Sequence, residues 1–398
     1  MDLAGRKTDD RSGLRRLAYQ FIILMGLISL FGDIVYEGGR SIIGPYLSTL
    51  GASAAIVGLI AGIGEFAGYF LRLPFGYLAD RSRAYWPLTI LGYGLILAVP
   101  LLGFAGSWQI AAVFIIAERL GKAIRSPARD AMLSYATKHV GRGFGFGLHE
   151  AMDQIGAIIG PLFFSAVFLL KGSYRQGFSI LWAPAILVLL ILMIARRKVA
   201  SPQELEMPRE TAADVKKEKL PHQFWIYVIF IFLSVAGLVN FPLIAYHINA
   251  KNVVATFQIP LLYAAAMALD GIAALIIGRI YDKAGLRSLM VIPFITFPVS
   301  FLGFSGSYGS VVAGIALWGI VMGIHETIMR SAIADLSSLR QRGLAYGVFN
   351  TVYGLAWFAG SAAVGFLYEI SLLYVILFAA VMEMMALVTF FFFKKRTL

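Results

Sequence analysis

The sequence has no cysteine and few charged residues, and each shortage excludes a class of protein. Without cysteine, none of the 398 residues can form a disulfide or serve as a thiolate ligand or nucleophile. Charged residues make up only 14% of the chain, against about a quarter in a typical soluble domain. A Gly-x4-Gly-Lys-[Ser/Thr] phosphate loop is also missing, so we expect no ATP-driven chemistry within this chain. These shortages exclude a disulfide-stabilised secreted domain and do not fit a soluble globular protein.

Apolar residues dominate the rest of the composition. They make up 59% of the chain, and the mean hydropathy is +0.78. A helix needs about 20 apolar residues to cross a bilayer. Runs of this kind occur near residues 19–46, 53–78, 86–105, 109–132, 144–169, 176–195, 224–247, 256–279, 288–305, 310–333, 343–367 and 370–393. We therefore expect an all-α membrane protein with twelve transmembrane helices in two six-helix bundles.

One long polar stretch, residues 196–221, separates the sixth run from the seventh. We predict an N-terminal six-helix bundle at 1–195, a cytoplasmic linker at 196–221 and a C-terminal six-helix bundle at 222–398. The first run carries Asp33 and Arg40 and lacks a small-residue cleavage site. It is therefore predicted to be a retained helix and not a signal peptide.

The distribution of Lys and Arg predicts the orientation of the chain. The odd-numbered connections between runs carry only Lys171, Arg175 and Lys251, whereas the ends of the chain and the other connections are rich in Lys and Arg. Because cytoplasmic segments carry the excess of basic residues, we predict that both termini are cytoplasmic and that the protein lies in the plasma (inner) membrane. This asymmetry and attraction to anionic lipids account for the net charge of +12, so we expect no nucleic-acid partner.

Short phrases of the sequence occur twice, about 200 residues apart, which is typical of transporters built from duplicated helix bundles. The first phrase lies where an apolar run gives way to a charged turn. The pairs are Gly76-Tyr-Leu-Ala-Asp80-Arg81 with Gly278-Arg-Ile-Tyr-Asp282-Lys283, Arg125-Ser126 with Arg330-Ser331, and Arg142-Gly143 with Arg342-Gly343.

With these repeats the chain resembles the major facilitator superfamily, whose signature between helices two and three contains a Gly, an Asp, a basic residue, a second Gly and further basic residues. The first copy departs from it at Arg83, where the second Gly is expected. The resemblance implies two bundles that move about a central cavity open to alternate sides, no enzymatic activity, and a monomer. The second copy matches at Gly278, Asp282, Lys283, Gly285 and Arg287, and the first at Gly76, Leu78, Asp80 and Arg81.

The resemblance also implies a latch that ties the two halves together when the cavity faces outward. By position, Asp80 would act with Arg129 and Asp130, and Asp282 with Arg330 and Asp335. An ion pair that exists in one state only sets the populations of the two states.

The fifth run has the spacing Gly-x8-Gly-x3-Gly-Pro at Gly147, Gly156, Gly160 and Pro161. This spacing is similar to a motif associated with proton-driven exporters of the superfamily. Small residues four apart let helices approach closely, and a proline can bend a helix. Ordinary packing of small residues is the alternative interpretation.

Charged residues within the apolar runs are costly in a bilayer and usually face a cavity or a partner. On the first run, Asp33, Glu37 and Arg40 share one stripe of a helix. Asp33 has no basic residue three or four positions later, so it is our first candidate for a proton-carrying group. A static ion pair between Glu37 and Arg40 is the alternative.

Further candidates lie on other runs. Arg119 resembles the helix-four arginine that the superfamily uses in proton transfer, which implies a pairing with Asp33 or Glu65. The second run also carries Arg72 and the fourth Glu118. The C-terminal half has fewer charges, and there we expect cavity residues at Asn240, Tyr246, His247, Asp270, His325, Glu326, Tyr353 and Trp357.

These patterns predict a secondary transporter whose partners are a small-molecule substrate, protons and the lipid bilayer. The favoured function is proton-coupled export of an amphipathic or hydrophobic molecule. One alternative is an importer or facilitator of a polar metabolite or organic anion. Another is a divalent metal exporter. A membrane enzyme or sensor would need a catalytic set that the sequence lacks. His149 and Asp153 could chelate a cation, but without a third ligand we expect an ion-paired cluster there, and neither a metal nor a cofactor.

Overall fold

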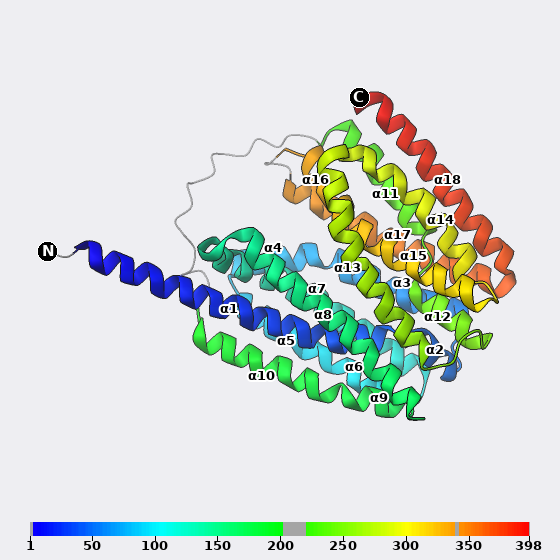
Figure 1. The fold of residues 1–398 in the computed structure, drawn as a ribbon, viewed down its shortest axis with the longest axis horizontal. Coiled ribbons are helices and arrows are strands. Elements are labelled where there is room, and N and C mark those ends of the chain that lie inside the picture. The colour runs from blue at the N-terminus through cyan, green and yellow to red at the C-terminus, as the bar shows by residue number, and fades with distance from the viewer. Residues whose placement is uncertain (1–2, 202–219, 339–341, 398) are drawn as a thin grey trace.

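The computed structural model describes residues 3–201, 220–338 and 342–397, and these residues form helices and connecting turns without any strand (Figure 1). The N-terminal half contains α1 (Leu3–Arg40), α2 (Ile43–Thr49), α3 (Ala54–Phe70), α4 (Arg72–Ser82), α5 (Tyr85–Gly94), η1 (Leu95–Leu97), α6 (Ala98–Leu101), η2 (Leu102–Phe104), α7 (Trp108–Val140), α8 (Arg142–Leu169), α9 (Tyr174–Ile180) and α10 (Trp182–Lys198). The C-terminal half contains α11 (His222–Gly237), α12 (Phe241–Ala250), α13 (Gln258–Ala284), η4 (Gly285–Met290), α14 (Val291–Gly303), α15 (Tyr308–Ile324), the π-helical turn η5 (His325–Met329), α16 (Arg330–Leu336), α17 (Arg342–Ile370) and α18 (Leu372–Thr397).

The helices confirm the predicted membrane fold. Within the described residues, 10 helical stretches are long and apolar enough to cross a bilayer, and one of them, Gln258–Gly303, has 46 residues and contains both α13 and α14. α7 is too charged to be counted among the 10, yet its 33 residues span about 50 Å at 1.5 Å per residue and it packs on α3 and α5. With α7 included and α13 and α14 counted separately, the described residues are compatible with the twelve predicted crossings. α7 also continues to Val140, beyond the predicted end at 132.

Several of the predicted runs are interrupted helices, which hydropathy did not indicate. The third run changes between α-helix and 3-10 helix from α5 to η2, and the sixth breaks at Leu181 between α9 and α10. The first run breaks between α1 and α2, and the seventh breaks at the equivalent place between α11 and α12. The second run breaks at Leu71, and the tenth contains the π-helical turn η5. A Cβ on Gly44 would overlap the carbonyl oxygen of Pro242, so the short pieces α2 and α12 cross at backbone contact. The breaks therefore re-aim the ends of two helices toward one another.

In the described residues the two halves meet mainly where α3 packs on α17, α8 on α13 and α2 on α12, and α12 also contacts α3. We call the side at which α1 begins and α18 ends the terminal side, and the side where α2 and α12 lie the distal side (Figure 1). Hydrogen bonds join the halves on the distal side, and two of them lie near helix ends. The Ser165 hydroxyl donates to the carbonyl of Phe257 (2.8 Å), and the backbone N–H of Ala55 donates to Glu369 (2.9 Å). The distal side is therefore closed.

Most of the predicted linker lies outside the described residues. α10 ends at Lys198 and α11 begins at His222, and positions 202–219 between them are not described. The division at 1–195, 196–221 and 222–398 therefore stays a prediction.

Candidate functional site: a charged cavity between the two bundles

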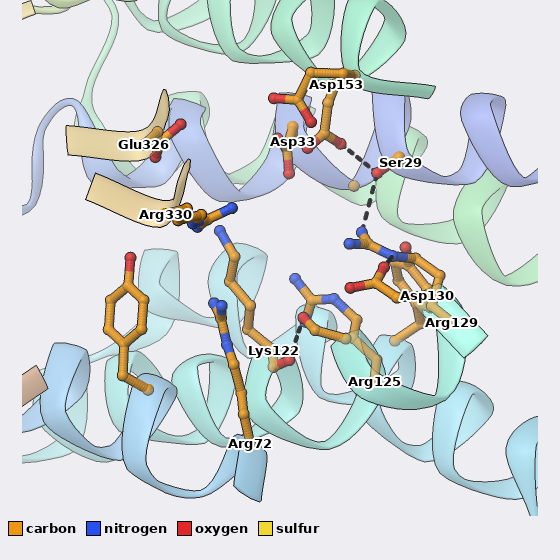
Figure 2. Close-up of a pocket in the computed structure, with 15 residues that line it drawn as sticks. Ser29, Asp33, Arg72, Lys122, Arg125, Arg129, Asp130, Asp153, Glu326 and Arg330 are labelled. Atoms are coloured by element: carbon orange, nitrogen blue, oxygen red, sulfur yellow. Dashed lines mark hydrogen bonds and ion pairs between the residues drawn. The ribbon is translucent and has the colours of Figure 1, made fainter. Parts of the chain in front are cut away.

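A cavity of about 150 Å³ lies between the two halves. Four of its charged lining residues, Asp130, Glu150, Glu326 and Arg330, are exposed to solvent, so the cavity opens toward the terminal side. Every lining residue except Gly32 carries a charged or hydroxyl group, and this does not suit the amphipathic cargo favoured from the sequence. The lining comprises Ser29, Gly32, Asp33, Tyr69, Arg72, Tyr93, Lys122, Arg125, Ser126, Arg129, Asp130, Glu150, Asp153, Glu326 and Arg330 (Figure 2).

Several of these groups bond to one another at the mouth of the cavity. Arg129 bonds Asp130 (Nε to Oδ1, 2.9 Å) and donates to the hydroxyl of Ser29 (3.3 Å). Ser29 in turn donates to Asp153. These linked bonds join α7 to α1 and α8 (Figure 2). The part of the cavity mouth that belongs to the N-terminal half is therefore held together by one hydrogen-bond network.

A smaller pocket of about 50 Å³ shares Tyr69, Arg72, Lys122 and Glu326 with the cavity. The carboxylate of Glu65 in its wall accepts from Arg40 (3.0 Å) and from Arg119 (3.1 Å). Of the two partners expected for Arg119, the structure thus selects Glu65. Glu118 lies behind them, 3.3 Å from Arg125 and 4.0 Å from Arg119. These buried charges are all paired, as buried charges must be.

Glu37 connects this network to the other half. Its carboxylate lies 3.7 Å from Arg40 and accepts a hydrogen bond from the hydroxyl of Tyr263 on α13 (2.5 Å). Because Glu37 is on α1, this bond crosses between the halves on the closed distal side. The pair of Glu37 and Arg40 is thus one part of a larger network, which sequence spacing could not indicate.

Asp33 does not join that network, although it was predicted on the same stripe as Glu37. It faces the larger cavity (Figure 2), where Asp153, Lys122, Glu37 and Arg125 are its charged neighbours. Among the described residues, no Lys, Arg or His lies within 4.0 Å of its carboxylate. Asp33 can therefore change its protonation state without breaking an ion pair.

Three cavity cations also lack a carboxylate within 4.0 Å in the described part of the chain: Arg72, Lys122 and Arg330. Aromatic rings hold two of them, since the guanidinium of Arg72 lies 4.6 Å from the ring centre of Tyr69 and the ammonium of Lys122 lies 4.0 Å from that of Tyr36. Sequence reasoning did not select Lys122 as a site residue. Lys122 lies four residues after Glu118 and three after Arg119, so it shares their face of α7. This spacing was a signal in the sequence that could have identified Lys122.

Of the predicted C-terminal cavity residues, Glu326 and Trp357 line the two cavities. The others lie outside these two linings. Asn240 donates to Ser361 (3.3 Å). His247 bonds Tyr368 (2.9 Å), whose ring also packs on Tyr246. Tyr353 packs between Tyr69 and His325, and Asp270 is buried on α13.

The latch residues are not tied together on this open side. Asp80 and Asp282 are exposed, and neither has an ion pair within 4.0 Å in the described residues. Asp335 accepts from Tyr281 (2.5 Å). Because the latch is expected in the state that opens on the distal side, it stays a prediction.

The two copies of the repeated phrase have similar surroundings at their first glycine but differ at the turn that follows. A Cβ on Gly76 would lie 3.5 Å from Pro127, and one on Gly278 would lie 3.5 Å from Thr327. Arg83, which replaces the expected glycine in the first copy, has φ +51° and ψ +21°, in the left-handed region that favours glycine. Gly285 has φ +56° and ψ −142°, so the two turns share a positive φ and differ in ψ. Arg81 donates to Tyr77 (2.8 Å), whereas no contact within 4.0 Å ties Lys283 or Arg287 to a carboxylate in the described residues.

The glycines of the fifth run pack α8 against α1. A Cβ on Gly156 would overlap the carbonyl oxygen of Leu30, and one on Gly160 would overlap that of Ile34. Gly147 has no neighbour within 4 Å of a Cβ position, and Pro161 lies inside the continuous helix α8. Both close contacts lie within the N-terminal half, so this geometry matches close packing of small residues. The link to antiport stays a prediction.

His149 is buried at the start of α8, and its Nε2 has no hydrogen-bond partner. In the described part of the chain, no group of three or more His, Asp or Glu side chains is arranged to hold a metal ion.

The comparisons with known proteins agree with the fold. The model of the Major Facilitator Superfamily matches residues 22–270 and 239–398. The chain is 40% identical to the uncharacterized protein Rv2265 of Mycobacterium tuberculosis, over 94% of this chain and 93% of the relative. It is 29% identical to the uncharacterized MFS-type transporter MJ1317 of Methanocaldococcus jannaschii, over 88% and 89%. Its fold is similar to the crystal structure of the nucleoside transporter NupG, with a TM-score of 0.71, 14% identity, and 94% and 98% of the two chains covered.

The chain belongs to the Major Facilitator Superfamily. It is an integral membrane transporter and not an enzyme, and its cargo is a small molecule that crosses the lipid bilayer.

Proposed function

We propose that this protein is a proton-coupled antiporter that exports its substrate by alternating access. The observation that carries the proposal is Asp33, a carboxylate that faces a cavity open to one side and has no cation within ion-pair distance among the described residues. It can take up or release a proton from water on that side.

Coupling follows from competition at this carboxylate. Asp153 lies beside Asp33 (Figure 2), and two carboxylates that face one site repel each other when both are charged. A proton on Asp33 relieves the repulsion, and so does a positively charged group of the substrate. Because either occupant excludes the other, the transporter exchanges one for the other as the cavity changes sides.

Glu37 supports the change of sides. Its hydrogen bond from Tyr263 joins the halves while the distal side is closed. When the halves separate there, this bond breaks and Glu37 keeps Arg40 as its partner. The bond therefore stabilises the state that opens on the terminal side.

In this proposal the terminal side is cytoplasmic, the protein lies in the plasma membrane, and a monomer is the working unit. Residues 1–195 and 222–398 move as the two bodies, and the latch residues near Asp80 and Asp282 close the terminal side in the opposite state. The excess of Lys and Arg at the chain ends and even-numbered connections supports this orientation.

A facilitator of polar metabolites is the second candidate, because the lining is charged or hydroxylated throughout. Reconstitution in liposomes that contain an internal pH dye separates the two candidates. We expect substrate to evoke proton movement that Asp33→Asn abolishes. Glu383→Gln is the matched control, since Glu383 is a buried carboxylate bonded to Ser234 between α11 and α18, outside the cavity. Substrate flux without proton movement would leave the facilitator.

A further inference from the structure

Acidic and basic groups gather in different parts of the cavity. Figure 2 shows the carboxylates of Asp33, Asp153 and Glu326 along one wall, on α1, α8 and η5, with Arg330 beside Glu326. The opposite wall carries Arg72 on α4 with Lys122 and Arg125 on α7, and there Asp130 lies beside Arg129. A solute between the walls thus meets both acceptors and donors.

Most basic groups near the centre of the molecule are already paired. Arg40 and Arg119 bond Glu65, Arg125 bonds Glu118, and Arg129 bonds Asp130. Arg72, Lys122 and Arg330 are the exceptions among the cations that line the cavity, as counted over the described residues.

These three cations have donor capacity that no group in the described residues uses. The Nε of Arg72 is buried and has no hydrogen-bond partner among those residues. Glu326 lies one turn before Arg330 but not within ion-pair distance of it. Figure 2 shows the ends of Lys122 and Arg330 directed toward the same space. Because they come from three helices and both halves, an anion between them would bridge the two bundles.

Some carboxylates of the cavity likewise have no cation partner in the described residues. Asp130 is held by Arg129, and Asp153 accepts from Ser29. Asp33, Glu150 and Glu326 have no cation within 4.0 Å in the described part of the chain. An ammonium group can therefore bind there, at the carboxylate that the antiport mechanism assigns to the proton.

The volume favours a small solute. The cavity of about 150 Å³ is smaller than the roughly 300–1,000 Å³ of pockets that hold drug-sized ligands. This space suits a short chain with few heavy atoms better than a large amphipathic molecule.

We propose that the substrate is a small zwitterion, whose anionic group binds Arg72, Lys122 and Arg330 and whose amine binds the carboxylates around Asp33. The proposal rests on the proposed transport through this cavity and adds the chemical class of the cargo. A proton and the amine compete for Asp33, which keeps the substrate class consistent with antiport. The anionic group needs cations from both halves, so binding is complete only when the halves meet around the cavity.

Three linear four-carbon compounds test the charge pattern in the full-length protein in liposomes. γ-Aminobutyrate carries one charge of each sign, putrescine two positive charges and succinate two negative charges. Glycine, β-alanine and δ-aminovalerate vary the separation of the charges. Counterflow of isotope-labelled compound without a proton gradient reports transport, and the pH dye reports coupling separately. We expect at least one of the four zwitterions to be transported with a half-saturation concentration at least tenfold below that of putrescine and succinate.

Variants locate the two ends of the substrate. Lys122→Gln should raise the half-saturation concentration at least tenfold, because it removes a charge-assisted hydrogen bond, and Lys122→Arg should restore most of the loss. Arg197→Gln removes an exposed cation at the end of α10 and should change nothing. Thermal stabilisation of the detergent-purified protein by the same zwitterion reports binding independently of flux.

The outcomes separate this proposal from the antiport proposal. Zwitterion counterflow without proton movement supports the substrate class and overturns antiport. Proton movement evoked by putrescine, with no response to any zwitterion, supports antiport and overturns the substrate class. The class is also overturned if succinate is preferred, if no zwitterion binds or is transported, or if Lys122→Gln behaves like Arg197→Gln.

Discussion

A substitution where α2 crosses α12 should shift the equilibrium between the states that are open and closed on the distal side. Gly44 lies against the backbone of Pro242, and a Cβ at this position would overlap the carbonyl oxygen of Pro242 and lie 3.0 Å from the backbone nitrogen of Tyr246. Backbone atoms cannot move aside as a flexible side chain does. Gly44→Ala must therefore push the two short helices apart, and these helices belong to different halves.

The expected magnitude follows from the cost of overpacking. One added methyl in a tight interface costs about 1–3 kcal/mol. The cost falls only on the state whose distal side is closed, because α2 and α12 separate in the other state. The ratio of distal-open to distal-closed molecules should thus rise roughly 5- to 150-fold.

Spin labels can measure this ratio, since the chain has no cysteine of its own. Thr49→Cys at the end of α2 and Lys251→Cys after α12 are both exposed. Their labels should show a short distance when the distal side is closed and a longer one when it is open. We expect Gly44→Ala to increase the population at the longer distance.

Gly309→Ala is the matched control. Gly309 begins α15 on the distal side, is exposed, and has no neighbour within 4 Å of a Cβ position. The distances between the two spin labels in Gly309→Ala should have the same distribution as in the labelled protein without this substitution. If Gly44→Ala gives the same distribution as Gly309→Ala while both variants elute and melt as folded protein, the assigned contact between α2 and α12 is wrong.

Three other predictions concern stability and topology. Glu65→Gln should destabilise the protein by about 3–5 kcal/mol, because it leaves buried cations without their carboxylate. Arg119→Gln should cost less, since Glu65 keeps a second partner, and equal losses in a denaturant titration in detergent would contradict this network. Arg83→Gly should be neutral or stabilise by up to about 1 kcal/mol, because the residue has φ +51°, and a clear loss of stability in the same titration would show that the left-handed turn is not strained. In intact cells, a membrane-impermeant maleimide should label Lys171→Cys but not Arg197→Cys, and the reverse pattern would place the termini outside.

The breaks within the helices could not be predicted from the sequence. Hydropathy found the runs of the first and seventh crossings because it sums apolar residues over a window. It could not see that each run bends, since the bends depend on contact between Gly44 and Pro242, about 200 positions apart. Arg83 shows a second limit: it differs from the expected glycine and still adopts a positive φ, as Gly285 does, but the two turns have different ψ angles, +21° and −142°, which the repeated phrase did not indicate.

The candidate site was predicted in part. Asp33 and Arg72 were selected because charge within an apolar run is costly, and both line the cavity. The same reasoning put Asp33 and Glu37 in one role, whereas the structure places them in different pockets. Lys122 was not selected, because a lysine in an apolar run more often lies near an interface.

The sequence by itself determined that the chain spans a membrane as helices and that its two halves repeat, because both properties are local patterns of apolar and charged residues. Only the tertiary structure decided which charges neutralise each other. Glu65 meets Arg40 and Arg119 from two other helices, whereas Arg72, Lys122 and Arg330 meet no carboxylate within ion-pair distance in the described residues. Pairing depends on distances between helices that are far apart in the chain, and those distances exist only once the helices pack.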